Sequence, residues 1–472
     1  RIICILSKGV GPSPPPAAPG ACAGSGLPGA QMAARQGPAR RPRVQAGDTV
    51  WVPDAARGFR AAVVQEILAG GVLSLAGPGS QQVAVAMAHP HCAEGAEATA
   101  DCVAMEHLNE ASLLENVCQR YARDEIYTHV AHVLLAVNPL RELPRLHGRP
   151  AMEPYLAKPR PGSRPPPHPY ALAEAALRGA RRGQAQAVVI SGESGAGKTE
   201  ATRAVLSFLA LRHAATDYIR DRLLRSTPVL EAFGNAHTRQ NTNSSRFGKF
   251  IEVHLSGESE VVGATLTPYM LEASRVAGEL PEGERTYHIF YLLQAALNAL
   301  SSGTTPPGPF WTRVANSPEW AELVEVAGPP MASSARLQTG PPEGRCVAGF
   351  EGLAEGLIGT GMRHAEVAEC CRLVAAIALL AEGSGAGRGD SCLSAAATLL
   401  RVEEADLRTF LTKVELSTGR ERVFRERTDR EAATLRASLS QELYAALFGW
   451  LTKLVARGIA PPKKTSGGGR ML

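Results

Sequence analysis

The sequence predicts an α/β fold in which helices flank a mixed, twisted β-sheet, with a small β-barrel before the sheet and a helical C-terminal third after it. Three observations predict this fold: a glycine loop that joins a strand to a helix, an alternation of strands and helices from 101 to 301, and an apolar residue at every fourth position near the end. The chain has 472 residues and 44% apolar content, which allows about three domains with buried cores.

Composition and charge argue against several classes of protein. The net charge of +5 is spread along the chain, so no surface for nucleic acid or for a membrane is indicated. The longest apolar stretch, 374–381, is too short to span a bilayer, and 2–6 is too short for the core of a signal peptide. Nine cysteines form no C-x-x-C or Cys/His array, so Cys370 and Cys371 are expected to be core thiols. We therefore expect a soluble, cytoplasmic protein.

The N-terminal part divides into a lead-in and a β-rich segment. Residues 1–46 are rich in Pro, Gly and Ala and are predicted to be a disordered lead-in. Short apolar segments separated by turn residues follow within 47–88, and they predict a small barrel. The predicted strands of this barrel are 49–52, 61–64, 71–75 and 82–85.

The region 101–301 is predicted to be the central α/β domain. Strands are predicted at 130–137, 185–191, 250–255 and 261–266, the last two as a hairpin around Ser256-Gly257-Glu258. Helices are predicted at 170–182, 199–213, 221–233 and 287–300. The proline-rich stretch 158–169 is predicted to be an exposed loop.

The C-terminal third, 302–458, is predicted to be mostly helical. Apolar residues recur every four positions between 429 and 458, and they predict a long amphipathic helix that needs a partner surface. These residues are Leu435, Leu439, Leu443, Leu447, Leu451 and Val455. Residues 459–472 are predicted to be a disordered tail.

The sequence GESGAGKT at 192–199 lies between the predicted strand 185–191 and the predicted helix 199–213. Its glycines let the backbone curl so that several N–H groups point toward a phosphate, while a lysine reaches the β and γ phosphates and a hydroxyl ligates Mg²⁺. The predicted ligand is ATP or GTP, and a glycine-rich turn without a ligand is the alternative. The predicted binding residues are Gly192, Glu193, Ser194, Gly195, Ala196, Gly197, Lys198 and Thr199.

A second polar cluster, AFGNAHTRQNTNSSRFGKF, occupies 232–250. So many side-chain amides and hydroxyls are costly to bury without polar partners, and a triphosphate with its metal would supply those partners. On this interpretation Ser244 or Ser245 binds Mg²⁺, Asn241 and Asn243 contact phosphate oxygens, and Arg246 is a fixed cation. A structural turn rich in Asn and Ser is the alternative.

Together these motifs closely resemble a myosin motor domain. GESGAGKTE is similar to the family's phosphate loop and NTNSSRFGKF to its first switch. The stretches 108–139 and 269–297 are similar to the segments that lead to the nucleotide pocket and follow the transducer hairpin, and GDTVWVP resembles the SH3-like subdomain. The resemblance runs from Gly47 to Arg457 and implies the motor head of a P-loop NTPase. The proline-rich lead-in is similar to those of unconventional classes, and class fifteen is the class suggested.

The resemblance implies roles for residues and partners for the chain. Lys198 would contact the terminal phosphates, and Arg246 would form one half of a gate over them. Thr199 and Ser245 would hold Mg²⁺, Asn241 and Ser244 would orient the γ-phosphate and the attacking water, and Asn138 and Pro139 would border the adenine. The resemblance also implies ATP and Mg²⁺ as cofactors, actin filaments as partner, a cytoskeletal location, and 302–458 as the upper, actin-side subdomain.

The sequence departs from the family's pattern at three points. Arg145 and then Leu146 stand where the family has an aromatic residue that contacts adenine, seven positions after Asn138, so weaker binding of the base is expected. Ala273 replaces a basic residue of the family's L-E-K-S-R segment. No Asp-x-x-Gly follows Arg246, although a phosphate-loop ATPase generally uses such an acidic element to support Mg²⁺ and the γ-phosphate.

The missing second switch predicts an incomplete motor fold. The relay helix, the lower half of the actin cleft, the converter and the light-chain-binding region are expected to be absent with it, and the start at Arg1 suggests a fragment. Two functions are left open: part of an actin-based motor ATPase, or a truncated, non-motile remnant that binds nucleotide with little or no hydrolysis. A small-molecule kinase is the third alternative, but the sequence shows neither a basic lid nor an acceptor pocket.

Overall fold

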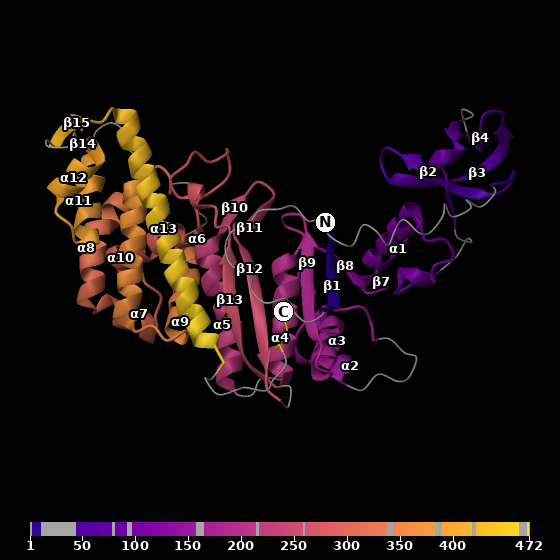
Figure 1. Ribbon diagram of the computed structural model, residues 1–472, viewed down its shortest axis with the longest axis horizontal. Helices are drawn as coiled ribbons and strands as arrows, with labels where there is room; N and C mark the ends of the chain where they lie inside the picture. Colours follow the sequence, from indigo (N-terminus) through magenta and orange to yellow (C-terminus); the bar gives the residue numbers. More distant parts are fainter. Residues whose placement is uncertain are drawn as a thin grey trace. The chain divides into compact units, whose positions relative to one another are not determined.

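The computed structural model describes residues 2–10, 44–77, 81–91, 97–156, 165–213, 217–257, 260–337, 343–382, 389–417, 422–461 and 470–471. The chain is a mixture of helices and strands (Figure 1) and forms two compact units. Unit 1 comprises Arg1–Gly179 with Gln184–Lys198, and unit 2 comprises Ala180–Gly183 with Thr199–Leu472. Within the described part of the chain, no helix is both long and apolar enough to traverse a lipid bilayer.

A small antiparallel sheet lies near the start of unit 1. Its strands pair in the order β5-β4-β3-β2-β6, with bounds β2 Thr49–Asp54, β3 Gly58–Leu68, β4 Val72–Leu75, β5 Gln82–Ala84 and β6 His89–Pro90. Apolar residues at alternate positions point to one face and form its core, namely Val50, Val52, Ala62, Val64, Leu73 and Leu75. The strands predicted between 49 and 85 are therefore present, and β6 adds a fifth.

The second sheet region of unit 1 leads to the glycine loop. Its strands pair antiparallel in the order β9-β1-β8-β7, with bounds β1 Ile2–Val10, β7 Tyr127–Val130, β8 Val133–Val137 and β9 Ala185–Gly192. The helices of this unit are α1 Glu110–Ala122, α2 Arg149–Leu156 and α3 Pro169–Arg181, the last continuing briefly into unit 2, with short 3-10 turns η3 Val85–Met87, η4 Cys102–Ala104 and η5 Pro144–Leu146.

Two predictions about this region need correction. The predicted strand 130–137 is instead a hairpin, because Ala131 has a φ of 55° and turns the chain between β7 and β8. An alanine rarely adopts this left-handed conformation, so the sequence carried no turn signal there. Residues 2–10 were predicted as part of the disordered lead-in, but they form β1. Their apolar residues favour a strand, whereas the prediction followed the composition of 11–46. Residues 11–43 lie outside the described part.

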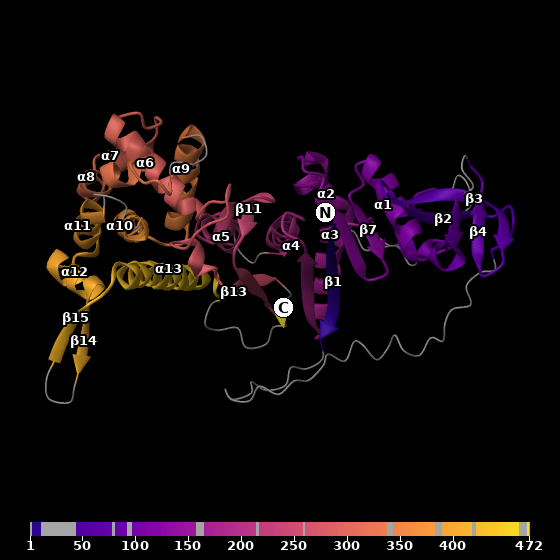
Figure 2. The ribbon, with the colours of Figure 1, turned by 90° about the horizontal axis from the view of Figure 1, so that it is seen from above.

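Unit 2 combines a second group of strands with most of the helices. Its β-strands are β10 Asn235–Thr238, β11 Asn241–Ser245, β12 Gly248–Leu255, β13 Val261–Tyr269, β14 Lys413–Ser417, β15 Arg422–Glu426 and β16 Arg470–Met471. The hairpin predicted at 250–266 is confirmed as the antiparallel pair β12 and β13. Residues 470–471, predicted as part of the disordered tail, instead form β16, which pairs with the edge of β12 that faces away from β13. β14 and β15 extend as a separate hairpin after α12 (Figure 2).

The helices of unit 2 are α4 Lys198–His213, α5 Asp217–Gly234, α6 His288–Ser302, α7 Pro309–Ala315, α8 Pro318–Ala332, α9 Glu343–Gly359, α10 His364–Ala381, α11 Gly389–Leu400, α12 Glu404–Thr412 and α13 Asp429–Ile459, with the 3-10 turn η6 Ala273–Arg275. The helices predicted before 301 are present within a few residues of their predicted ends. Cys370 and Cys371 are buried in α10, as predicted, and burial raises the pKa of both thiols.

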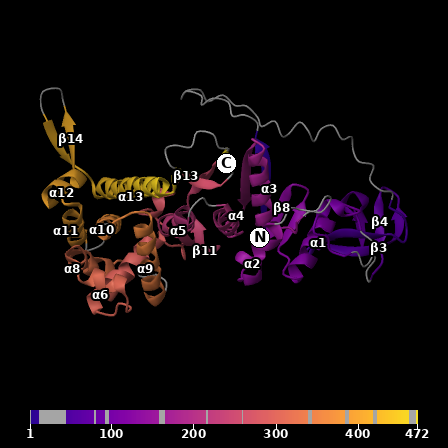
Figure 3. The same ribbon diagram turned by 90° about the horizontal axis from the view of Figure 1, so that it is seen from below.

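The long helix α13 finds its partner surface on α10, α5 and β13 (Figure 3). It begins with a capping box between Thr428 and Glu431. The predicted apolar stripe is only partly correct: Leu447, Leu451 and Val455 are buried, but Leu435, Leu439 and Leu443 are half-buried. Residues four apart are offset by about 40° around a helix of 3.6 residues per turn, so a stripe with this spacing turns away from the buried face along the helix. Ser440, Tyr444 and Phe448 are also on the buried face.

The end of α13 approaches β13 closely at Gly263. A Cβ atom at this position would lie 2.6 Å from the backbone oxygen of Ile459 and 2.6 Å from the backbone nitrogen of Pro461. Only glycine lets the two backbones come so near. The contact fixes where the helix ends against the strand.

Tyr444 connects α13 to the rest of unit 2. Its ring is fully buried and stacks on Tyr287 with 4.9 Å between ring centroids, and its hydroxyl donates to the backbone oxygen of Phe233 at 2.7 Å. The burial and the surrounding groups keep the phenol neutral, since they raise its pKa well above the ordinary value.

We predict that Tyr444→Phe lowers the free energy of unfolding by about 1–2 kcal/mol, because the Phe233 oxygen loses its donor while the ring packing stays. Urea unfolding followed by circular dichroism measures this loss. Trp450→Phe is the control, since Trp450 is 46% exposed on the same helix and the change is expected to cost less than about 0.5 kcal/mol. Equal effects of the two substitutions would show that the hydroxyl contributes nothing.

Candidate functional site

The glycine loop follows β9 directly and ends where α4 begins. Gly195 and Gly197 have φ values of 72° and 98°, a conformation that side chains other than glycine rarely allow. Ala196 between them is 1% exposed. Gly192, the third glycine of the motif, is the last residue of β9. The loop therefore turns sharply through two of the three predicted glycines.

Lys198 folds back over this loop. Its Nζ donates to the backbone oxygens of Gly192 at 2.7 Å and of Glu193 at 2.8 Å. Partial burial lowers the pKa of the Lys198 ammonium, because burial disfavours the charged form of the group. An anion beside this ammonium would favour its charged form.

Asn138 connects the loop to the end of β8. Its Nδ2 donates to the backbone oxygen of Gly195 at 2.7 Å, and its Oδ1 accepts from the backbone N–H of Leu140 at 2.9 Å. The backbone oxygen of the following Pro139 lies 3.5 Å from the Tyr121 hydroxyl. The amide of Asn138 thus braces the curled loop from the neighbouring turn.

In unit 2, the structure brings together two hydroxyls that the sequence assigned to Mg²⁺. Thr199 Oγ1, on the second residue of α4, lies 3.4 Å from Ser245 Oγ at the end of β11. Across the part of the chain that the structure describes, no three His, Cys, Asp or Glu side chains are grouped to hold a metal ion. A cation here would therefore rely on hydroxyl oxygens and on oxygens brought by its ligand, which suits Mg²⁺.

The predicted polar cluster forms the hairpin of β10 and β11, and many of its side chains bond within it. Asn241 Oδ1 accepts from the backbone N–H of Asn243 at 3.0 Å. Asn243 Oδ1 accepts from Asn235 Nδ2 at 3.0 Å and lies 3.1 Å from His288 Nε2. Ser244 is 3% exposed and pairs in register with Ala236. The hairpin thus satisfies part of its polar side chains by internal hydrogen bonds, in addition to any that a bound phosphate would supply.

Arg246, at the end of this hairpin, is held by a carboxylate that the sequence interpretation missed. Its Nε lies 2.5 Å from Glu272 Oε2, which also accepts from Arg275 Nε at 2.8 Å. Arg275 is 3% exposed, and its Nη2 reaches Glu284 at 2.9 Å. The only signal in the sequence was the position of Glu272 and Arg275 in the LEASR stretch, where Ala273 begins η6.

Glu272 is an acid whose charged form is favoured. Burial alone would raise its pKa, but hydrogen bonds from Arg246 and Arg275 lower it below the ordinary value of 4.5. The hydroxyl of Tyr287 donates to the backbone oxygen of Glu272 at 2.8 Å. These contacts join the polar hairpin, η6 and the start of α6.

The departure at Arg145 and Leu146 also has a structural counterpart. Arg145 Nη2 donates to the backbone oxygen of Arg123 at 3.2 Å and lies 3.3 Å from Asp124 Oδ2. The backbone oxygen of Leu146 lies 2.9 Å from His168 Nε2. Both residues are thus bonded to groups other than the glycine loop.

Comparison with known proteins shows what the region around these motifs is similar to. Residues 99–304 match the family model of the myosin head (motor domain). The chain is 41% identical over 251 residues to myosin heavy chain 95F of Drosophila melanogaster and 46% identical over 196 residues to unconventional myosin-VI of Homo sapiens. It is 32% identical over 390 residues to myosin-3 of Arabidopsis thaliana.

These matches cover 52%, 41% and 80% of this chain. The corresponding shares of the relatives are 20%, 15% and 32%. The chain therefore spans a third or less of the length of the relatives that it matches.

We predict that Glu272→Gln lowers the free energy of unfolding at pH 7 by about 1–2 kcal/mol, because two arginines lose a charged acceptor. A carboxyl whose pKa is lowered by folding contributes stability above its ordinary pKa and loses it as pH falls through the lowered value. The difference between the two proteins should therefore shrink below pH 4.5, the ordinary value. Urea unfolding at pH 7, 4.5 and about 3.5 tests this.

Glu282→Gln serves as the control, since Glu282 is exposed in the same region. Its substitution should leave stability nearly unchanged at each pH. A difference for Glu272→Gln that stays constant as the pH falls would contradict the charge interaction.

Proposed function

From the match of residues 99–304 to the family model of the myosin head (motor domain) and the similarity to known myosins, we propose that this chain carries the ATP-binding part of an actin-based motor. Actin filaments are the partner on this proposal, and the cytoskeleton is the location. The small sheet β2–β6 corresponds to an SH3-like barrel, and β9 with its loop and α4 to the core of a P-loop NTPase. The assignment to class fifteen stays a prediction.

The loop from Gly192 to Lys198 is the observation that carries the proposal. Its two left-handed glycines curl the backbone, and Lys198 Nζ already lies over the loop at 2.7 Å and 2.8 Å from two carbonyl oxygens. A bound phosphate would replace these neutral acceptors with charged oxygens, which form stronger hydrogen bonds to an ammonium. Glu193 and Ser194 would contribute backbone N–H groups of the cradle. Ala196 would do so after its N–H leaves the Glu193 oxygen, to which it donates at 3.2 Å.

The hydroxyl pair fits a Mg²⁺ ion that arrives with the nucleotide. Two oxygens that bind one Mg²⁺ at its usual distance lie about 3 Å apart when they are neighbours in an octahedron. Thr199 Oγ1 and Ser245 Oγ are 3.4 Å apart, so a small adjustment suffices. When bound, the ion would neutralise charge on the β- and γ-phosphate oxygens.

The remaining predicted site residues would act on the γ-phosphate and the base. Asn241 and Ser244 would orient the γ-phosphate and the attacking water, and Asn243 would contact a phosphate oxygen after exchanging one of its partners in the hairpin. Asn138 and Pro139 would border the adenine. Arg246 would form one half of the gate over the phosphates.

One observation favours the second candidate function, nucleotide binding with little or no hydrolysis. Arg246 Nε is already paired with Glu272 at 2.5 Å, so this nitrogen is not available to a second carboxylate. Loss of a single hydrogen bond that stabilises the transition state often lowers the rate of hydrolysis by a factor of about 10² to 10³. Binding and hydrolysis therefore need separate measurements.

We predict that the full chain binds a fluorescent ATP analogue in the presence of Mg²⁺, and that Lys198→Ala weakens binding by at least about tenfold, since the ammonium pairs with charged oxygens. Thr199→Ala should weaken binding mainly when Mg²⁺ is present, because it removes a metal ligand. Fluorescence titration with and without EDTA measures both effects.

Lys453→Ala is the matched control, as it removes an exposed lysine of α13. Unchanged affinity in Lys198→Ala would overturn the nucleotide site. Phosphate release, measured with and without actin filaments, separates the candidates: stimulation by actin supports the motor, and tight binding with only trace release supports the non-motile alternative.

A further inference from the structure

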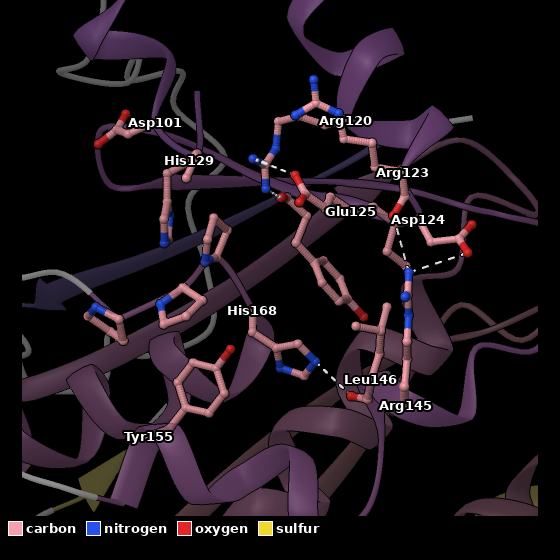
Figure 4. A pocket seen from close by; sticks show the side chains of 16 residues that line it. Asp101, Arg120, Arg123, Asp124, Glu125, His129, Arg145, Leu146, Tyr155 and His168 are labelled. Atoms are coloured by element: carbon pink, nitrogen blue, oxygen red, sulfur yellow. Dashed lines mark hydrogen bonds and ion pairs between the residues drawn. The ribbon is translucent and has the colours of Figure 1, made fainter. Parts of the chain in front are cut away.

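Unit 1 holds a cavity of about 550 Å³ between α1, β7, α2 and residues 165–168 (Figure 4). This volume falls within the usual range for small-molecule sites, about 300–1,000 Å³. Of the described residues, neither those of the glycine loop nor Asn138 and Pro139 line it. The cavity therefore lies apart from the glycine loop, although Arg145 and Leu146, which stand at the family's adenine-contacting position, are part of its lining.

One wall of the cavity is aromatic. His168 lies 4.7 Å from Tyr127 and 5.5 Å from Tyr155, measured between ring centroids. Both ring nitrogens of His168 are used, Nε2 with the Leu146 oxygen at 2.9 Å and Nδ1 as acceptor from the Tyr170 N–H at 3.1 Å. Burial lowers the pKa of His168 to about 3. At neutral pH the wall is thus uncharged and held in place.

The hydroxyl of Tyr155 is the unusual polar group of this wall. Tyr155 is only 6% exposed, and Figure 4 shows its hydroxyl directed toward the cavity. Within the described ranges, this hydroxyl has no hydrogen-bond partner. Burial raises its pKa to about 12, so it is a neutral donor. Because the hydroxyl faces the cavity, it can donate to an acceptor on a ligand there.

Guanidinium groups lie on another side of the cavity. Arg120 is committed to the protein, because it contacts Glu125 at 2.9 Å and donates to Thr128 Oγ1 at 3.0 Å. Arg145 is 60% exposed and shares the carboxylate of Asp124 with Arg141. One acid thus serves two arginines. The lining holds three arginines, Arg120, Arg123 and Arg145, and three acids, Asp101, Asp124 and Glu125. Arg145 shares its carboxylate with a second arginine, so it can attract a ligand that carries a single negative charge.

We propose that this cavity binds a planar aromatic carboxylate. Its ring packs against Tyr155 and His168, one acceptor oxygen receives the Tyr155 hydroxyl, and its negative charge faces Arg145. Aromatic rings favour stacked or edge-on packing with other rings, and a carboxylate matches the fork of donors on a guanidinium. A single charge is favoured over a polyphosphate because the lining holds as many acids as arginines.

The test uses three naphthalene probes and the full chain in isothermal titration calorimetry. The probes are 2-naphthoate, its neutral amide and 2-naphthylmethylamine, which share the ring and differ in charge. We expect 2-naphthoate to bind at least about fivefold more tightly than the amide, as one charge-assisted hydrogen bond implies, and the amine to bind least. Tyr155→Phe and Arg145→Gln should each weaken binding of 2-naphthoate about fivefold or more.

The control variant is Arg149→Gln, which removes an exposed arginine near the cavity but outside its lining and should leave affinity unchanged. Thermal melting checks that each variant is folded. Equal binding of the three probes, or unchanged affinity in folded Tyr155→Phe, would overturn the proposal. Competitive displacement of 2-naphthoate by Mg-ATP would also overturn it, because the cavity would then belong to the nucleotide site.

Discussion

The turn from β9 into α4 depends on a backbone conformation that only two of its residues supply. Gly195 and Gly197 have positive φ values, and Ala196 is packed between them with 1% of its surface exposed. A side chain at either glycine would strain the turn. Because α4 starts at the next residue, the turn decides where Lys198 begins the helix and lets its Nζ fold back over the loop. The amide of Asn138 then holds the turn from outside.

In unit 2, one continuous series of contacts connects the polar hairpin to the hydrophobic core. Glu272 holds Arg246, its backbone oxygen accepts from Tyr287, and the ring of Tyr287 stacks on Tyr444. Tyr444 in turn donates to Phe233 near the end of α5. The charged end of the hairpin and the long helix α13 are thus fixed to the same core. Movement of Arg246 away from Glu272 would break the first contact of this series only.

Local patterns predicted most of the elements, whereas contacts between distant residues could not be predicted. The hairpin of β12 and β13 and the helix α13 followed from alternation and helical spacing, and the glycine loop followed from its motif. The turn at Ala131 was missed because alanine gives no signal for a positive φ. Glu272 and His288 were missed because their partners, Arg246 and Asn243, lie 26 and 45 residues away. The pairing of β1 was hidden by the composition of the residues that follow it.

The segment 138–146 contacts both the glycine loop and the aromatic cavity of unit 1. Its first residue, Asn138, holds the backbone oxygen of Gly195, and its last two residues, Arg145 and Leu146, line the aromatic cavity. A ligand that shifts this segment at one end would also change the contacts that the segment makes at the other end. Thermodynamic linkage makes such an effect reciprocal: a change in affinity at the glycine loop caused by an occupant of the cavity must be matched by an equal change at the cavity caused by an occupant of the loop.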